Sequence, residues 1–174
     1  MPLSPSQRLA SIDDLLLYRL ARLSSVAGAM VVRLCEGGYG ITRREWGVVA
    51  QLYENGSLPP SALAERMHRD RARTSRTLTA LGHKGMVLRT IPANDRRTAL
   101  VSLTPAGRHL YEVLMPRIQA INSQILKALE PEEAAQFDLA LERLLAQSQI
   151  LVTELSLDLP KANRRQGQRG KAAS

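Results

Sequence analysis

The sequence predicts a mainly α-helical fold: a winged helix-turn-helix with a two-stranded β-wing, and long N- and C-terminal helices. Three observations predict it. Apolar residues recur every three or four positions in long segments towards both ends of the chain. A short helical segment is followed almost at once by a second one rich in arginine. Two short apolar and β-branched runs then flank the loop PANDRR, residues 92–97.

The length of 174 residues suits one domain with a sizeable core. No apolar run approaches the roughly 18–20 residues that span a bilayer, and the start of the chain lacks the pattern of a signal peptide. A single cysteine excludes an intramolecular disulfide and suits a reducing compartment. We therefore expect a cytoplasmic protein that has no cofactor and does not engage a membrane.

Basic residues are concentrated in two parts of the chain, whose formal net charge is +8. Residues 66–97 hold nine Lys or Arg against two acids, and residues 161–174 hold five Lys or Arg and no acid. Because the combined net charge of these two parts is larger than the net charge of the whole chain, the remaining residues are net acidic. This asymmetry points to a polyanionic partner such as nucleic acid.

Local signals delimit the first two helices. Apolar spacing over residues 12–34 predicts the first, and two of the glycines in the stretch 36–40 are expected to end it with a left-handed stop. Thr42 and Glu45 have capping-box spacing at the start of the second helix. The Asn-Gly pair at 55–56 is expected to end it.

Signals of the same kind delimit the later helices. A short third helix follows the two prolines at 59–60, and the fourth has Asp70 as N-cap and Gly85 as its left-handed stop. After the two strands, Thr104 caps a fifth helix. Acids at 130–133 suit the positive end of a last helix.

These elements predict one domain between two flexible ends. We expect a flexible N-terminus at residues 1–11, a single domain at 12–157 and a basic disordered tail at 158–174. Within the domain, a winged-helix lobe at 41–103 lies between long helical segments at 12–35 and 104–157.

The fourth helix has an apolar side and an arginine-rich side. Thr74, Leu78 and Leu81 share the side expected to pack, whereas Arg73 and Arg76 lie opposite. An arginine-rich face alone is usually a solvated face. A hairpin that directly follows such a helix favours a winged helix instead, whose second helix enters the major groove of DNA.

The loop between the strands completes this interpretation. Asp95 is placed to pair with Arg97 and to direct that guanidinium group into a minor groove, which leaves Arg96 for phosphate. We therefore expect contacts to double-stranded DNA from both the helix and the wing. The predicted DNA-binding residues are Arg71, Arg73, Ser75, Arg76, Thr79, Asp95, Arg96 and Arg97.

The stretches LAERM, SRTLTALGHKGMV, DRR and LTPAG resemble the MarR family of bacterial transcriptional regulators, over roughly residues 12–155. The resemblance implies a homodimer in which the long N- and C-terminal helices, residues 12–35 and 104–157, form a dimerisation base. This base would present two winged-helix lobes to a palindromic operator. It implies that Ser75 and Arg76 are the polar pair of the recognition helix, and that Asp95 and Arg97 are the wing pair. Thr74 departs from the pattern, because an apolar residue is usual there.

The expected function is a sequence-specific DNA-binding transcriptional regulator, a homodimeric repressor relieved by a small-molecule effector. The resemblance implies a pocket for a small aromatic or anionic effector, with Tyr39, Trp46 and Tyr53 as candidate lining residues. Two alternatives stay open: a thiol-based redox-responsive regulator through Cys35, and a sequence-neutral DNA-binding protein. Nucleotide loops, nucleophile elbows and histidines at metal-ligand spacing are absent from the sequence, so we expect neither an enzyme nor a metal site.

Overall fold

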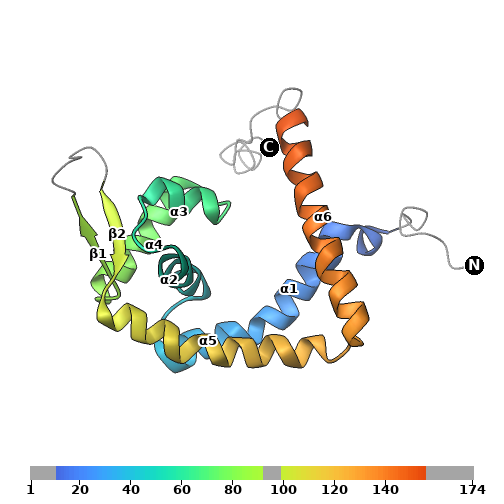
Figure 1. Cartoon of the computed structure of the whole chain (residues 1–174), viewed down its shortest axis with the longest axis horizontal. Coiled ribbons are helices and arrows are strands. Elements are labelled where there is room, and N and C mark those ends of the chain that lie inside the picture. The colour runs from blue at the N-terminus through green and yellow to red at the C-terminus, as the bar shows by residue number, and fades with distance from the viewer. Residues whose placement is uncertain (1–10, 92–98, 156–174) are drawn as a thin grey trace, which may run out of the picture. The chain divides into compact units, whose positions relative to one another are not determined.

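The computed structural model describes residues 11–91 and 99–155 and is mainly helical, with one two-stranded sheet (Figure 1). The chain divides into two units, residues 1–125 and residues 126–174. The elements are η2 (Ile12–Asp14), α1 (Leu16–Val32), η3 (Arg33–Gly38), α2 (Arg43–Asn55), α3 (Pro60–Arg66), α4 (Arg71–His83), β1 (Val87–Thr90), β2 (Leu100–Leu103), α5 (Pro105–Leu126) and α6 (Pro131–Leu155). The predicted tail at 158–174 and, apart from Ser11, the predicted flexible N-terminus lie outside the described residues.

The start and end signals of α2 are confirmed. The Glu45 amide donates to Thr42 Oγ1 (3.2 Å) and the Thr42 amide donates to Glu45 Oε2 (2.6 Å), so both halves of the capping box form. Ile41, directly before the cap, is buried. Gly56 ends the helix with φ 73°, a conformation that glycine adopts without steric cost.

The stretch 36–40 ends the first helical segment as expected, but through a turn that the sequence did not predict. After α1 the chain continues as a π-helical turn, η3, which includes Gly37 and ends at Gly38. Gly40, with φ 63°, is the left-handed residue. The Ile41 amide donates to the Cys35 carbonyl oxygen (3.2 Å) and closes this wider turn, so the chain reverses only after the buried Cys35 is in place.

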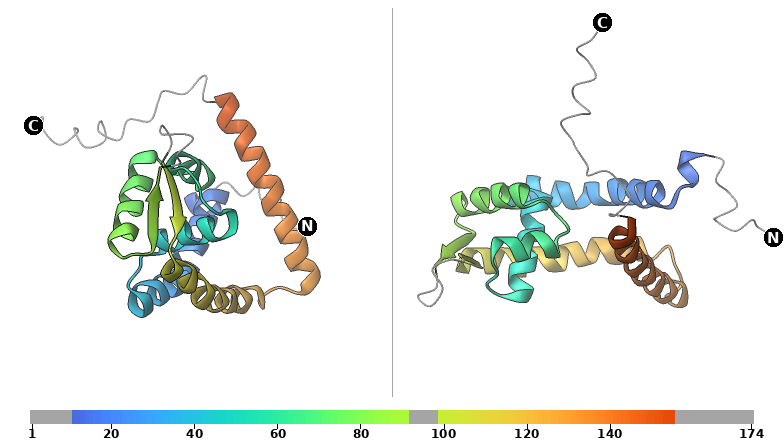
Figure 2. Two further views of the ribbon diagram at one scale, coloured as in Figure 1. Left: turned by 60° about the vertical axis from the view of Figure 1, so that its left-hand side comes forward. Right: turned by 90° about the horizontal axis from the view of Figure 1, so that it is seen from above.

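The wing is an antiparallel pair in which Val87 faces Leu103 and Thr90 faces Leu100. The strands lie side by side and β1 follows α4 (Figure 2). A third segment joins them, which the sequence did not predict: Leu58 and Val101 exchange two backbone hydrogen bonds, of 3.0 and 2.9 Å. Because an isolated hairpin is marginally stable, this bridge helps to fix β2 at the base of the wing.

The core of the first unit lies among α2, α3, α4, the strands and the start of α5. Its largest fully buried apolar side chains are Ile41, Leu52, Leu63, Leu78, Leu81 and Leu114, each exposed by no more than 1%. Burying a side chain of this size stabilises the fold by about 1.5–3 kcal/mol. The core thus fixes α4 against α2 and α3.

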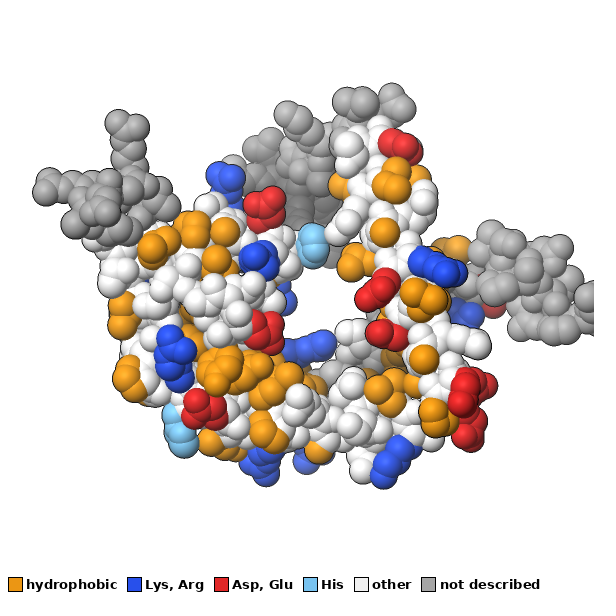
Figure 3. Space-filling model, viewed as in Figure 1, with side chains coloured by type: hydrophobic (Ala, Val, Ile, Leu, Met, Phe, Trp, Pro, Cys, Tyr) orange, Lys and Arg blue, Asp and Glu red, His pale blue; other side chains and the backbone are white. Residues whose placement is uncertain are grey.

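The second unit contains α6, whose start is negatively charged as predicted. Glu132 and Glu133 lie in the first turn, and the Glu133 carboxylate accepts from the Glu130 amide (2.9 Å). Many apolar side chains of α6 are at the surface (Figure 3). They are Phe137, Leu139, Leu144, Leu145, Ile150, Leu151 and Val152. None of the helices in the described part of the chain has the length and hydropathy of a membrane span.

Candidate nucleic-acid interface

The connection between α3 and α4 is short and tightly bonded (Figure 1). His68 adopts φ 48°, and the Arg69 amide donates to the Ala64 carbonyl oxygen (2.8 Å), which turns the chain sharply. Asp70 caps α4 as predicted, because its Oδ1 accepts from the Arg73 amide (2.7 Å). Gly85 ends the helical segment with φ 69°, also as predicted. This layout is a helix-turn-helix with α4 as the second helix.

The two sides of α4 are separated as the sequence predicts. Thr74, Leu78 and Leu81 are buried, with exposed fractions of 2%, 1% and 0%. The predicted DNA-binding residues of the helix are all exposed: Arg71, Arg73, Ser75, Arg76 and Thr79. An exposed face with three guanidinium groups presents both phosphate ligands and base-edge donors to a duplex.

Asp70 also holds the direction of one of these arginines. Arg73 Nε lies 3.1 Å from Asp70 Oδ2, and both side chains are about half exposed. An ion pair at such a surface contributes little to folding stability, but it restricts the rotamers of Arg73. The hydroxyl of Thr79 donates to the Ser75 carbonyl oxygen (3.1 Å). Thr79 therefore offers a ligand its methyl group and oxygen lone pairs.

The predicted wing residues Asp95, Arg96 and Arg97 lie outside the described residues. The pairing of Asp95 with Arg97 therefore stays a prediction. The strands on either side of this segment are described, and on β1 the residues Arg89 and Thr90 are exposed. The base of the wing thus adds a further exposed cation to the lobe.

An ion pair that sequence reasoning missed joins the end of α4 to the start of α2. Lys84 Nζ lies 2.8 Å from Glu45 Oε2 and donates to the Gly40 carbonyl oxygen (2.8 Å). Burial of the Glu45 carboxyl group raises its pKa, but hydrogen bonds from Lys84 and Thr42 outweigh burial, and the pKa lies below its ordinary value. Glu45 is therefore ionised at neutral pH.

The three aromatic residues predicted to line an effector pocket lie in two different settings. Trp46 and Tyr53 stack on Tyr111 of α5, with ring centroids 5.5 and 3.8 Å apart. The phenol of Tyr39 instead accepts from Arg117 (2.8 Å), whose guanidinium also lies over the ring. Sequence reasoning missed Tyr111, whose pKa is raised by burial and by the nearby Glu54 carboxylate.

A surface pocket of about 890 Å³ lies between α2 and α4. Trp46 lines it, whereas Tyr39 and Tyr53 are not among its lining residues. The walls are formed by Ser24, Val32, Glu36, Thr42, Arg43, Arg44, Glu45, Trp46, Gly47, Arg69, Arg76, Thr77 and Ala80. Arg76, a predicted DNA-binding residue, is therefore also a wall of this pocket.

Cys35 is fully buried in η3, with no exposed surface. Burial raises the pKa of its thiol, the Glu36 carboxylate raises it further, and the Arg43 charge opposes both. A buried thiol with a raised pKa holds little thiolate, which is the reactive form. These properties favour a packing role over the thiol-switch alternative.

Comparison with known proteins agrees with this geometry. The profile of the MarR family matches residues 41–99. The homoprotocatechuate degradative operon repressor of Escherichia coli is 32% identical over 108 residues, which cover 62% of this chain and 73% of that protein.

Two solved structures share the fold. MepR of Staphylococcus aureus, in a complex with DNA, has a TM-score of 0.70 at 22% identity, over 76% of this chain and 98% of that one. BpsR of Bordetella bronchiseptica, whose DNA binding is regulated by 6-hydroxynicotinic acid, has a TM-score of 0.69 at 21% identity, over 77% and 95%. Given the exposed arginine face of α4, the capped helix-turn-helix and the 32% identity to a repressor, the chain belongs to the MarR family and is a winged-helix, DNA-binding transcriptional regulator.

Proposed function

We propose that the protein is a homodimeric repressor that binds a palindromic operator and is released by a small aromatic or anionic effector. The observation that carries the proposal is the exposed arginine face of a helix whose opposite side is fixed in the core. The E. coli relative is itself named as an operon repressor. The proposed site of action is the cytoplasm, and the proposed role is binding rather than catalysis.

The proposed contacts divide between the two grooves. Arg71, Arg73, Ser75, Arg76 and Thr79 would meet base edges and phosphates in the major groove. Asp95 and Arg97 would act together at the minor groove, with Arg96 on phosphate. Since phosphate contacts release counterions, the affinity of the complex is expected to fall steeply with salt.

Exposed apolar residues support the homodimer. Leu16, Leu17, Leu23, Val26 and Met30 of α1 are exposed, as are seven large apolar residues of α6. Surfaces of this kind commonly mark interfaces, and two copies of the chain would cover them. We propose residues 12–35 and 104–157 as the dimerisation segments and residues 41–103 as the DNA-binding lobe.

Aromatic acids are the proposed effector class. The E. coli relative represses a homoprotocatechuate degradative operon, and 6-hydroxynicotinic acid regulates the DNA binding of BpsR. Both compounds are aromatic carboxylic acids. An effector can release the operator only if it binds the DNA-free arrangement more tightly than the DNA-bound one. A change in the separation of the two lobes would meet this condition, because the half-sites of a palindrome have a fixed spacing.

Selection of binding sequences from random duplexes tests the proposal. The selected sequences are expected to contain two half-sites about one helical turn apart. At physiological salt the protein should bind the selected duplex far more tightly than a scrambled one, and Arg73→Ala should reduce this discrimination by about 1–3 kcal/mol. Equal binding to both duplexes would support the sequence-neutral alternative, and a monomer in sedimentation would contradict the homodimer.

A further inference from the structure

Two large apolar side chains of the wing are exposed where no dimer contact is proposed. Leu88 is 40% exposed and Ile91 is 66% exposed. Within the described residues of the lobe, 41–91 and 99–103, no other large apolar residue is exposed. Every other large apolar residue that the described chain exposes lies in the segments 12–35 and 104–157, which are proposed for the dimer. A dimer built on those segments would therefore leave Leu88 and Ile91 uncovered.

Ile91 stands at the end of a well-fixed strand. β1 begins beside α5, where the Thr104 amide donates to the Met86 carbonyl oxygen (3.1 Å). It then runs away from α5 to Thr90, the last residue that pairs with β2 (Figure 1). On its other edge, β2 is bridged to the connection between α2 and α3. The backbone is thus fixed up to the residue directly before Ile91.

The polar neighbours of Ile91 suit the edge of a DNA groove. Arg89 and Thr90 are exposed, and Arg89 has no carboxylate within ion-pair distance in residues 11–91 and 99–155. Residues two apart in a strand are separated by roughly 7 Å, which is comparable to the minor-groove width of about 6 Å. Arg89 can therefore reach a phosphate at the edge of the groove while Ile91 lies inside it.

A protein partner fits this surface less well than DNA does. A stable protein interface buries about 800 Å² on each partner around an apolar core. Two apolar side chains with an arginine and a threonine between them are too few for such a core. Proteins that occupy the minor groove, by contrast, insert apolar side chains such as isoleucine between base pairs and kink the duplex by about 20–90°. One exposed isoleucine on a fixed strand meets this requirement.

We propose that Ile91 enters the minor groove as a wedge, partly unstacks two neighbouring base pairs and bends the operator. The wedge rests on the proposed function in one respect, because it needs an operator bound in a fixed register. It adds deformation of the duplex to base reading by α4. TA and CA/TG steps are the easiest to open, so the wedge selects such steps without a hydrogen bond to either base pair.

Energy transfer between dyes at the two ends of the selected duplex tests the bend. We expect the wild type to bring the ends closer, Ile91→Ala to leave the bound duplex straighter, and Ile91→Leu to keep the bend, because leucine is also an apolar wedge. An adenine analogue whose fluorescence rises on unstacking should brighten only with the wild type and Ile91→Leu. The Ile91 side chain is exposed, so all three proteins should unfold at the same temperature.

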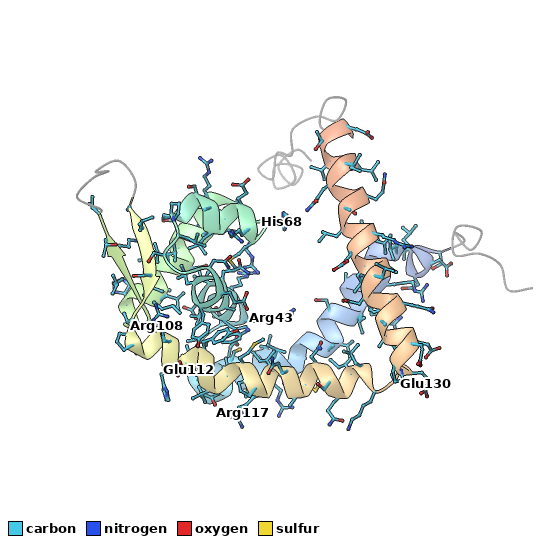
Figure 4. The ribbon with its side chains drawn as sticks, in the orientation of Figure 1. Arg43, His68, Arg108, Glu112, Arg117 and Glu130 are labelled. Carbon is cyan, nitrogen blue, oxygen red and sulfur yellow. The ribbon has the colours of Figure 1, made fainter. Side chains whose placement is uncertain are left out.

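Matched variants separate the wedge from apolar surface and from charge. Leu88→Ala removes an exposed apolar side chain from the start of the same strand and should leave the bend unchanged. Arg89→Gln should weaken operator binding and its salt dependence but retain the bend. Arg108→Gln removes the same charge at the start of α5, beside the base of the wing, and should change neither property (Figure 4).

The results that overturn the wedge differ from those that overturn the proposed function. A selected operator that stays straight with the wild type, or bends equally with Ile91→Ala, refutes the wedge alone. A bend that Leu88→Ala and Ile91→Ala reduce equally has the same meaning. If Ile91→Ala instead changes the sedimentation of the DNA-free protein, the side chain contacts a second copy, and the wedge is wrong. If the wild type selects no sequence, the proposed function fails, and the wedge fails with it.

Discussion

The ammonium group of Lys84 lies 2.8 Å from the carboxylate of Glu45, and this contact joins the end of α4 to the first turn of α2. The carboxylate is almost completely buried, with 5% of the side chain exposed, and it also completes the cap of α2 by accepting from Thr42. One acidic side chain therefore fixes both the start of α2 and the end of the proposed recognition helix.

Loss of Lys84 should destabilise the lobe. Lys84→Met leaves the Glu45 carboxylate buried without its cation, and we expect a decrease of about 1–3 kcal/mol in the free energy of unfolding. Urea unfolding at pH 7 measures this value. Lys84→Arg retains the charge and should lose less. If both variants lose the same free energy of unfolding, the geometry of the Lys84 side chain rather than its charge determines how much it stabilises the lobe.

The same pair predicts a dependence of stability on pH. The folded-state pKa of Glu45 is lowered, so its stabilisation is fully present above the unfolded value of about 4.3 and is lost as the pH falls through the folded value. The difference in unfolding free energy between the wild type and Glu45→Gln should be constant from pH 7 to about 5 and then shrink. A difference that grows on acidification would contradict the lowered pKa.

Asp70 has two roles that substitutions can separate. Asp70→Asn keeps a side chain that caps helices well but removes the ion pair with Arg73, whereas Asp70→Ala removes both. Only the alanine variant should lose stability, by about 1 kcal/mol. Both variants should discriminate less between the selected operator and a duplex with one mismatched base pair. The ratio of the affinities for the two duplexes measures this discrimination. Removal of the Asp70 carboxylate makes the protein more positive and strengthens binding to both duplexes alike, so this general effect cancels in the ratio.

Gly107 permits close packing between the start of α5 and the residue before β1. A Cβ at Gly107 would collide with the backbone carbonyl of Met86, which cannot rotate away. Gly107→Ala should therefore cost about 1–3 kcal/mol in thermal or urea unfolding. The matched control is Gly82→Ala on α4, where a Cβ meets no neighbouring atom within 4 Å and should stabilise the helix by up to about 1 kcal/mol.

The burial of Cys35 predicts low reactivity. Because burial raises the pKa of the thiol, iodoacetamide should alkylate the folded protein much more slowly than the urea-unfolded protein at pH 7.5. Operator binding should be unaffected by micromolar peroxide. If peroxide releases the protein from its operator, and Cys35→Ser abolishes this release, the result would support the thiol-based redox-responsive alternative.

The parts of the fold that sequence reasoning predicted correctly depend on residues close together in the chain. Thr42 and Glu45 are three residues apart, and Asp70 bonds to the amide of Arg73. The left-handed stop at Gly85 is equally local. The amphipathic pattern of α4 also follows from spacing within a single helix, so its buried and exposed sides were predicted correctly.

The features that sequence reasoning missed join residues that are far apart in the chain. Lys84 contacts Glu45 across 39 positions, and Tyr53 bonds to Glu112 across 59. No local pattern indicates which partner a lysine or an aromatic ring will meet. The pocket between α2 and α4 is of the same kind, because only packing brings Arg43 and Arg44 of α2 close to Arg69 and Arg76.

The bridge between Leu58 and Val101 has a consequence for how the sequence can vary. Connections between helices usually tolerate insertions and deletions, because they run over the surface. Here Leu58, within the short stretch between α2 and α3, must meet Val101 of β2 through both of its backbone groups while the stretch also leads into α3. Adding or removing a residue would move Leu58 out of line with Val101 and break both hydrogen bonds. In related proteins that keep this pairing, the spacer between α2 and α3 should therefore have constant length even where its composition changes.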